Sequence, residues 1–176
     1  GPGWEDETDV GPVINGAALE KIHSYTEIGV DEGARLLTGG EVAADGDLAK
    51  GFYYRPTIFG GVDAEMRIAQ EEIFGPVMSV IPFKDEAEAI RIANESPYGL
   101  AAAVWTRDIF KAFRVVKSLD AGIVWVNHMQ PTFVEAPWGG YKMSGFGREL
   151  GHWGVEEYLE TKQVFINLDE KPIGWY

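Results

Sequence analysis

Two short segments of this 176-residue chain hold side chains whose types and spacing suit ligand chemistry. The first, residues 70–76, places the carboxylate of Glu72 two residues ahead of the ring of Phe74, just before an apolar run. In α/β folds, ligands usually bind at the carboxyl ends of strands, so a position ahead of a strand also fits an ordinary solvated loop acid. From residue types alone, both a binding role and a structural role stay open for Glu72.

The second segment, residues 137–151, combines five glycines with a single lysine and the aromatic rings of Trp138, Tyr141 and Phe146. An indole face such as that of Trp138 attracts ammonium groups through a cation–π contact worth roughly 0.5–2 kcal/mol. Glycine clusters are also common in tight, backbone-dense surface loops that carry no function. From residue types alone, both a functional loop and a plain turn-rich surface loop stay open for this segment.

Apolar patterning predicts the elements that must position these segments. Near-continuous apolar runs predict three strands buried on both faces, at residues 77–83, 100–106 and 122–126. Asp85 and Asp108 can each cap a helix between two of these strands. Strand–helix–strand connections this short favour right-handed crossovers. We therefore expect an α/β fold with a mostly parallel sheet flanked by helices, in which the three strands are adjacent and parallel.

The remaining parts of the chain are less regular. Asn15 can cap a helix that runs towards Ile28. A short strand follows at residues 34–38, a polar surface loop at 41–51, and an extended segment at 53–59, which Pro56 places at an edge or a turn. The long glycine-rich loop ends at residue 151, where we place the end of the main domain, residues 1–151. The tail, residues 152–176, is expected to hold a helical turn at 155–159 and a half-exposed strand at 161–168 that pairs with another subunit.

Composition excludes several classes of function. The chain has 15 basic and 28 acidic residues, a net charge of −13, which disfavours binding to nucleic acids or to anionic membrane surfaces. It has no cysteine, so disulfides, thiol catalysis and cysteine-ligated metals are excluded for these residues. No apolar run is long enough for a membrane span, and no signal peptide is evident, which predicts a cytoplasmic protein. The opening at Gly1, without a methionine, is expected to be a cut end or a tag remnant.

Taken together and in this order, the two segments resemble the C-terminal third of the NAD(P)-dependent aldehyde dehydrogenase superfamily. The resemblance extends over nearly the whole chain, through residues 11–14, 55–57, 86–93, 98–101 and 124–127. Trp138, the run at residues 147–151 and the closing residues 174–176 are most similar to the betaine-aldehyde and aminoaldehyde branch.

The resemblance implies how a cofactor, NAD or NADP, would be held. Glu72 would accept hydrogen bonds from the nicotinamide-ribose hydroxyls, Phe74 would pack near the nicotinamide, and Lys21 would lie along the cofactor. Glu149 matches a buried glutamate that relays protons near the thiol site, a role for which burial would supply a raised pKa.

The resemblance also implies a substrate site. Phe133 and Trp138 match residues that line the aldehyde tunnel, and an indole face suits a cationic aminoaldehyde or betaine aldehyde. Ile123 matches a position that tunes pocket width, and its bulk favours aminoaldehydes. The alternative for Trp138 is a packed loop tryptophan beside a generic apolar aldehyde pocket. Lys142 and Gly145 match positions that border a potassium site between subunits.

The mechanism of this family needs a nucleophilic cysteine, and the chain has none. The nucleophile, the water-activating glutamate and the Rossmann half lie upstream in the family, so this chain alone is expected to be inactive. We expect its partners to be a small-molecule aldehyde, the missing N-terminal part and further copies of itself. The alternatives are a truncated, non-catalytic oligomerisation module and a small-molecule-binding domain.

Overall fold

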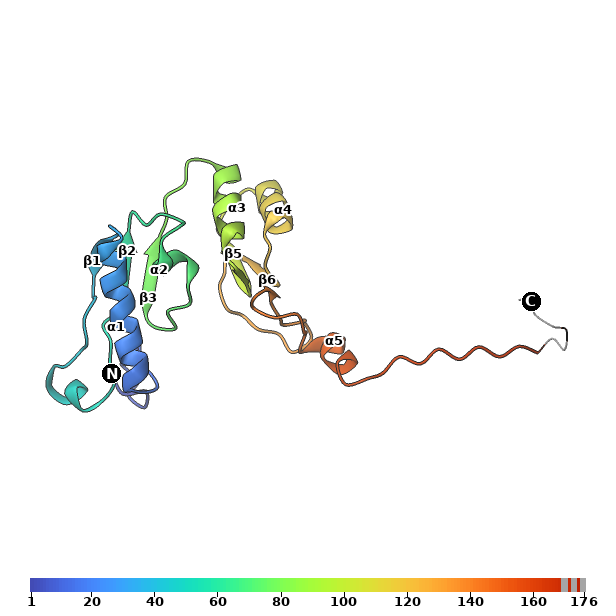
Figure 1. Cartoon of the computed structure of the whole chain (residues 1–176), viewed down its shortest axis with the longest axis horizontal. Helices are drawn as coiled ribbons and strands as arrows, with labels where there is room; N and C mark the ends of the chain where they lie inside the picture. The colour runs from blue at the N-terminus through green and yellow to red at the C-terminus, as the bar shows by residue number, and fades with distance from the viewer. Residues whose placement is uncertain (169–170, 172–173, 175–176) are drawn as a thin grey trace.

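The computed structural model describes residues 1–168, 171 and 174. The chain forms two lobes joined in the middle of the sequence, and a C-terminal tail extends away from the second lobe (Figure 1). The first lobe contains the helices and strands up to residue 80, and the second contains those from residue 86 onwards.

The first lobe is a three-stranded sheet covered by a long helix. The strands β1 (Arg35–Thr38), β2 (Thr57–Gly60) and β3 (Val77–Val80) lie in the order β1-β2-β3. The β1–β2 pair is antiparallel and the β2–β3 pair is parallel. Helix α1 (Gly16–Asp31) begins where the Asn15 side chain accepts a hydrogen bond from the amide of Ala18, as predicted.

A closed apolar core lies between α1 and this sheet. Gly29 lets α1 pack closely against the sheet, because a Cβ atom there would lie only 3.1 Å from the ring of Phe59 on β2. Phe59 and Ile22 are fully buried at the centre of the core. The other buried members are Ala34, Tyr54, Val62, Ile68 and Ile73. The predicted surface loop at residues 41–51 contains a short 3-10 helix, η1 (Gly46–Lys50), and α2 (Arg67–Gln70) is a further helical turn that the sequence pattern did not predict.

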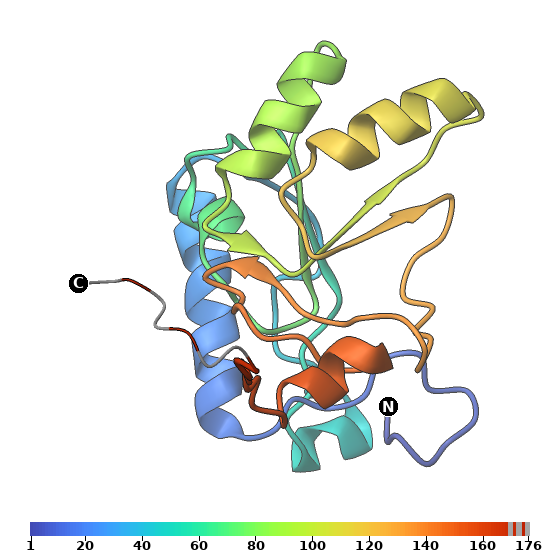
Figure 2. The same ribbon diagram turned by 90° about the vertical axis from the view of Figure 1, so that its right-hand side faces the viewer.

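The second lobe is built around a parallel strand pair. The strands β5 (Ala101–Val104) and β6 (Ile123–Val126) pair in register, with Ala101 opposite Ile123. Helices α3 (Glu86–Glu95) and α4 (Ile109–Ser118) lie on one side of this pair (Figures 1 and 2). Both begin at the predicted aspartate caps, whose side chains accept hydrogen bonds from amides of the first turn. A second, antiparallel pair joins β4 (Tyr98–Gly99) to β7 (Tyr141–Lys142).

The predicted arrangement of the three strands is wrong in two respects. The strand at residues 77–80 does not lie beside the strand at 101–104 but pairs with β2. Pro56 was expected to place the segment that contains β2 at an edge or a turn, yet β2 is the central strand of its sheet. The three strands are also not buried on both faces, since Met78 and Val80 are exposed and β5 and β6 are only half-buried. An apolar run encodes a tendency to be buried, but the neighbouring elements decide whether anything covers it.

The end of the chain departs from the predicted pattern as well. Helix α5 (Gly151–Glu156) lies slightly before the expected helical turn. Residues 161–168 form no strand; their side chains are exposed and the segment leaves the body of the chain (Figure 1). Pairing of this segment with another subunit stays a prediction. Trp175 and Tyr176, cited for the resemblance, lie outside the described residues. No helix in the described part of the chain is long and apolar enough to cross a membrane.

Candidate functional site

The loop after α2 presents Glu72 and Phe74 from an anchored backbone. Between them, Ile73 is buried in the core of the first lobe. Gly75 lies so close to α1 that a Cβ atom there would come within 2.5 Å of the side chain of Ile22. With Ile73 turned inwards, Glu72 and Phe74 are both exposed, on either side of the anchor. The loop therefore displays a carboxylate and a ring together while its backbone is held against the core.

Lys21 and Glu72 are brought together, although 51 residues separate them in the sequence. The Lys21 Nζ atom donates a hydrogen bond of 2.8 Å to the backbone carbonyl of Glu72. The Glu72 carboxylate itself has no hydrogen bond or ion pair to any of the described residues. A carboxylate in this state has all its acceptor sites available for the hydroxyl groups of a ligand.

The preceding glutamate, Glu71, is in the opposite situation. Its two oxygens accept hydrogen bonds of 2.8 and 2.9 Å from the Arg67 guanidinium, and the Tyr25 hydroxyl donates a third, of 2.6 Å. The hydrogen bonds from Arg67, and then that from Tyr25, lower the pKa of Glu71 to about 2. The same contact with Glu71 raises the pKa of Tyr25. Sequence reasoning missed this cluster, although the i,i+4 spacing of Arg67 and Glu71 is a known signal.

Phe74 has a strained backbone. Its φ angle is 58°, in the left-handed region that residues other than glycine rarely adopt. Such a conformation costs on the order of 1–3 kcal/mol and persists only where the surroundings impose it. Here the buried Ile73 and the tightly packed Gly75 impose it from both sides, and the Phe74 ring is left 79% exposed. An exposed ring held in this way can pack against a flat ligand.

A second candidate region surrounds Trp138. Its ring lies 6.2 Å from that of Trp125 on β6, at an angle of 53°, and the Trp125 indole N–H donates a hydrogen bond of 3.1 Å to the carbonyl of Pro131. The two rings border an open pocket of about 510 Å³ on the β5–β6 pair. The lining residues are Leu100, Ala101, Ala102, Ala103, Trp125, Met129, Gln130, Thr132 and Trp138. Trp125 was missed as a candidate, although it lies two residues after Ile123 in the same strand.

The other two residues predicted for the substrate tunnel do not line this pocket. Ile123 shares a strand face with Trp125 and pairs with Ala101, which lines the pocket, but Ile123 itself is not among the lining residues. Phe133 is 63% exposed and belongs to the loop beyond β6. Of the three predicted tunnel residues, only Trp138 therefore lies at the pocket within this chain.

Glu149 and Trp138 are neighbours through their backbones. The amide of each donates to the carbonyl of the other, at 2.7 and 2.8 Å, which forms an isolated antiparallel bridge across the glycine-rich loop. The Glu149 side chain is exposed, so the burial that the resemblance implied is not present. None of the described residues covers this side of the loop.

Asn127 joins the ends of β5 and β6. Its side chain accepts a hydrogen bond of 2.8 Å from the amide of Thr106 and donates one of 2.9 Å to the carbonyl of the same residue. This pair of contacts gives Asn127 a structural role, because it ties together the segments that follow the two strands.

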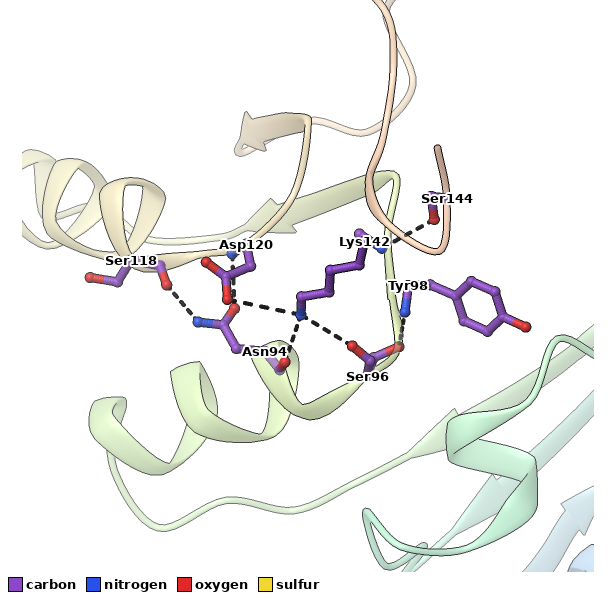
Figure 3. A network of polar contacts seen from close by, with 8 residues as sticks. Asn94, Ser96, Tyr98, Ser118, Asp120, Lys142 and Ser144 are labelled. Atoms are coloured by element: carbon purple, nitrogen blue, oxygen red, sulfur yellow. Dashed lines mark hydrogen bonds and ion pairs between the residues drawn. The ribbon is translucent and has the colours of Figure 1, made fainter. Parts of the chain in front are cut away.

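Lys142 and Gly145 do not form a set of metal ligands. The Lys142 ammonium donates to the carbonyls of Asn94, at 2.6 Å, and Ser96, at 3.1 Å, and lies 3.9 Å from the carboxylate of Asp120 (Figure 3). An ammonium group is itself a cation and cannot ligate potassium. No group of three or more His, Cys, Asp or Glu side chains suited to a metal ion occurs among the described residues. That Lys142 and Gly145 border a potassium site in an assembly stays a prediction.

Comparison with known proteins agrees with the class that the fold and the two loops indicate. The model of the aldehyde dehydrogenase family matches residues 1–164, and the chain belongs to this family. It is 50% identical over 176 residues to a betaine aldehyde dehydrogenase of Bacillus subtilis and 49% identical over 172 residues to a peroxisomal aminoaldehyde dehydrogenase of Malus domestica.

A solved structure is similar over the whole chain. The betaine aldehyde dehydrogenase of Staphylococcus aureus, crystallised in complex with NAD+, superposes with a TM-score of 0.95 at 46% identity. The match covers 100% of this chain and 35% of that one. The sequence matches likewise cover 100% and 98% of this chain, but only 36% and 34% of the two relatives. The chain thus spans about a third of the length of the relatives it matches.

Proposed function

We propose that this chain is the C-terminal part of an NAD-dependent aldehyde dehydrogenase that oxidises a cationic aminoaldehyde or betaine aldehyde to the carboxylate. The observation that carries the proposal is the loop at residues 71–76. It presents the Glu72 carboxylate, which has no partner among the described residues, and an exposed ring from a backbone that Ile73 and Lys21 hold in place. Family membership and the NAD+ complex of the similar structure support the same assignment.

The residues of this loop fit a dinucleotide. Glu72 can accept hydrogen bonds from the two hydroxyls of a ribose, because its carboxylate is exposed and unused in the described structure. Phe74 can pack against the nicotinamide ring and limit its movement. Lys21 uses one of its three donors on the Glu72 carbonyl, which leaves two for the cofactor. Bound NAD would supply the hydride acceptor, and the part of these residues is to hold and orient it.

A cationic substrate is favoured by the pocket beside Trp138. Two indole rings lie at its edge, and a cation–π contact is worth roughly 0.5–2 kcal/mol, more as the site is closed to water. The net charge of −13 favours the approach of a cation over that of an anion. The bulk of Ile123, on the strand face next to the pocket, favours a slim aminoaldehyde over the trimethylated betaine aldehyde. A generic apolar aldehyde pocket is the alternative for this site.

The chain needs the rest of such an enzyme to act. It contains no cysteine that could attack the aldehyde, so we propose that the nucleophile and the remainder of the cofactor site lie in an N-terminal part. That part would also bury Glu149, which is exposed here, and so favour its role in proton relay. We further propose that residues 161–168 pair with another subunit, and that the complete enzyme is cytoplasmic.

A non-catalytic oligomerisation module is the second candidate. It is favoured by the absence of cysteine and by the exposed apolar side chains of the tail, Val164, Phe165 and Ile166. The mass of the protein in its native source separates the two candidates. A mass near 19.4 kDa would favour the module, and a mass about three times as large the dehydrogenase.

The decisive experiment measures NADH formation by the complete protein. It compares an ω-aminoaldehyde with an uncharged aldehyde of the same length, for the wild type and for Glu72→Gln. We expect a preference for the cationic aldehyde, and a KM for NAD that rises roughly tenfold in the variant, as for the loss of a charge-assisted hydrogen bond. Glu20→Gln, an exposed glutamate on α1, is the matched control and should leave the KM for NAD unchanged. No aldehyde oxidation by the complete protein would refute the proposal.

A further inference from the structure

The side chain of Lys142 reaches a cradle of oxygen atoms from separate elements. Two are the backbone carbonyls of Asn94 and Ser96 at the end of α3, and the third is the carboxylate of Asp120, between α4 and β6 (Figure 3). Lys142 lies on the short strand β7, and its side chain is only 26% exposed. The ammonium group thus sits where three parts of the second lobe meet.

This cradle is suited to a monovalent cation. The last carbonyls of a helix have no partner within the helix and carry the negative end of its dipole. The Asn94 side chain holds the surroundings in place, because it donates 2.7 Å to the carbonyl of Ser118 and accepts 2.9 Å from the amide of Asp120. Rings of carbonyl oxygens are also what proteins use to replace the water shell of potassium.

The cradle lies at the base of the loop that carries Trp138 and Glu149. Beside Lys142, the amide of Met143 donates 3.0 Å to the carbonyl of Pro97, and the Ser144 hydroxyl accepts 3.1 Å from the amide of Gly99. Lys142 itself has a φ angle of 54°, an unfavourable conformation that a strong side-chain contact can offset. The loss of the ammonium would therefore release both the side-chain contact and the strained backbone at the foot of the loop.

We propose that the Lys142 ammonium acts as a tethered monovalent cation: it fills this oxygen cradle and so positions residues 137–151, including Trp138 at its pocket. Lys142 is then a positioning residue that touches neither the aldehyde nor the cofactor. Only the kinetic part of its test rests on the proposed function.

The test uses Lys142→Ala in the complete protein, with Lys142→Met as the matched variant. Alanine opens a space that a small primary ammonium ion can enter, whereas methionine fills the space without a charge. In Lys142→Ala we expect faster hydrogen exchange over residues 137–151 and unchanged exchange in α1 and β2. Ethylammonium chloride should restore the protection, and lithium chloride at the same ionic strength should not. Lys142→Met should show the same loss without rescue.

The kinetic part separates loop positioning from general instability. For Lys142→Ala we expect the KM for the aldehyde to rise by up to about 100-fold, as for a misplaced substrate contact, while the KM for NAD stays unchanged. Ethylammonium should reverse the rise. The inference would be overturned if residues 137–151 of Lys142→Ala exchanged hydrogen at the wild-type rate, or if no amine restored their lost protection. An equal rise of the KM values for the aldehyde and for NAD would also overturn it. A wild-type protein that oxidises no aldehyde would refute the proposed function instead and leave the exchange test valid.

Discussion

The two lobes of this chain are built from sequence patterns of similar quality but end in different states. Eight of the nine buried apolar residues among those described lie between residues 22 and 73, and the ninth is Ala112 on α4. The first lobe therefore closes a core of its own between α1 and the β1–β3 sheet. The second lobe has well-capped helices and a parallel strand pair, yet it buries almost none of its apolar side chains.

The difference is most evident on α4. This helix has an apolar face, but Ile109, Phe110 and Phe113 on it are more than half exposed. An apolar cleft of about 470 Å³ also stays open between α3, α4 and β5. Exposed apolar surface of this extent marks a surface that another part of a protein covers. An amphipathic pattern thus specifies which face should be buried, whereas the partner that buries it must come from elsewhere in the assembly.

The division has a functional side. The candidate cofactor loop, residues 71–76, lies on the closed lobe, where its backbone is anchored in the core. The candidate substrate loop, residues 137–151, lies on the open lobe and is held by backbone contacts and by Lys142. Packing positions the cofactor loop, whereas polar and backbone contacts position the substrate loop. We therefore expect substitutions in the two lobes to change stability by different amounts.

The largest expected effect is in the closed core. Phe59→Ala removes a fully buried ring and should lower the free energy of unfolding by roughly 3–5 kcal/mol. Urea denaturation of the 176-residue chain, followed by circular dichroism, measures it. A loss below about 1 kcal/mol would mean that the core of the first lobe is not closed as described.

A smaller effect is expected where the open lobe relies on backbone contact. A Cβ atom at Gly122 would overlap the carbonyl oxygen of Gly139, so Gly122→Ala should cost roughly 1–3 kcal/mol through forced displacement. Gly147→Ala is the matched control, in the loop that carries Gly139, because the nearest atom to the Cβ position of residue 147 is 3.9 Å away. Equal stabilities of the two variants, measured by thermal unfolding, would contradict a tight contact between residues 122 and 139.

The ion pair between Arg67 and Glu71, beside the cofactor loop, should make the free energy of unfolding depend on pH. Because the pKa of Glu71 falls from 4.5 to about 2 on folding, its contribution to stability is fully present above about pH 4.5. It is lost as the pH falls towards 2. The difference in unfolding free energy between wild type and Glu71→Gln should therefore be constant near neutral pH and shrink in acid. A difference that grows on acidification would show that the carboxylate is not held by Arg67 and Tyr25.

The smallest effect is expected on the open face of α4. Phe110 is 80% exposed, so Phe110→Ala should change the stability of the 176-residue chain by no more than about 0.5 kcal/mol, far less than Phe59→Ala. In the complete protein, the same substitution should cost considerably more, because the ring would then be covered. Denaturation curves of wild type and Phe110→Ala, recorded for the 176-residue chain and for the complete protein, test this prediction. An equally small loss of stability in both proteins would mean that no partner covers this face of α4.

Much of the local structure could be predicted from particular residues. Asn15, Asp85 and Asp108 cap the helices that they were expected to cap, and the strands at residues 35–38, 101–104 and 123–126 lie within the predicted segments. Short-range signals of this kind act within one turn or one strand, so sequence alone reveals them. The position of residues 77–80 beside β2, by contrast, depends on a pairing over about 20 residues that no local signal specifies.

The candidate site divides in the same way. The motifs that contain Glu72, Phe74, Trp138 and Lys142 carry the resemblance to the family, and these side chains determine what hydrogen bonds, ring contacts and charges are available. Only the tertiary structure decided that Lys21 holds the Glu72 carbonyl, that Glu71 rather than Glu72 is neutralised by Arg67, and that Glu149 lies exposed. The physical reason is that chemistry resides in single side chains, whereas burial and partnership depend on residues that meet only after the chain has folded.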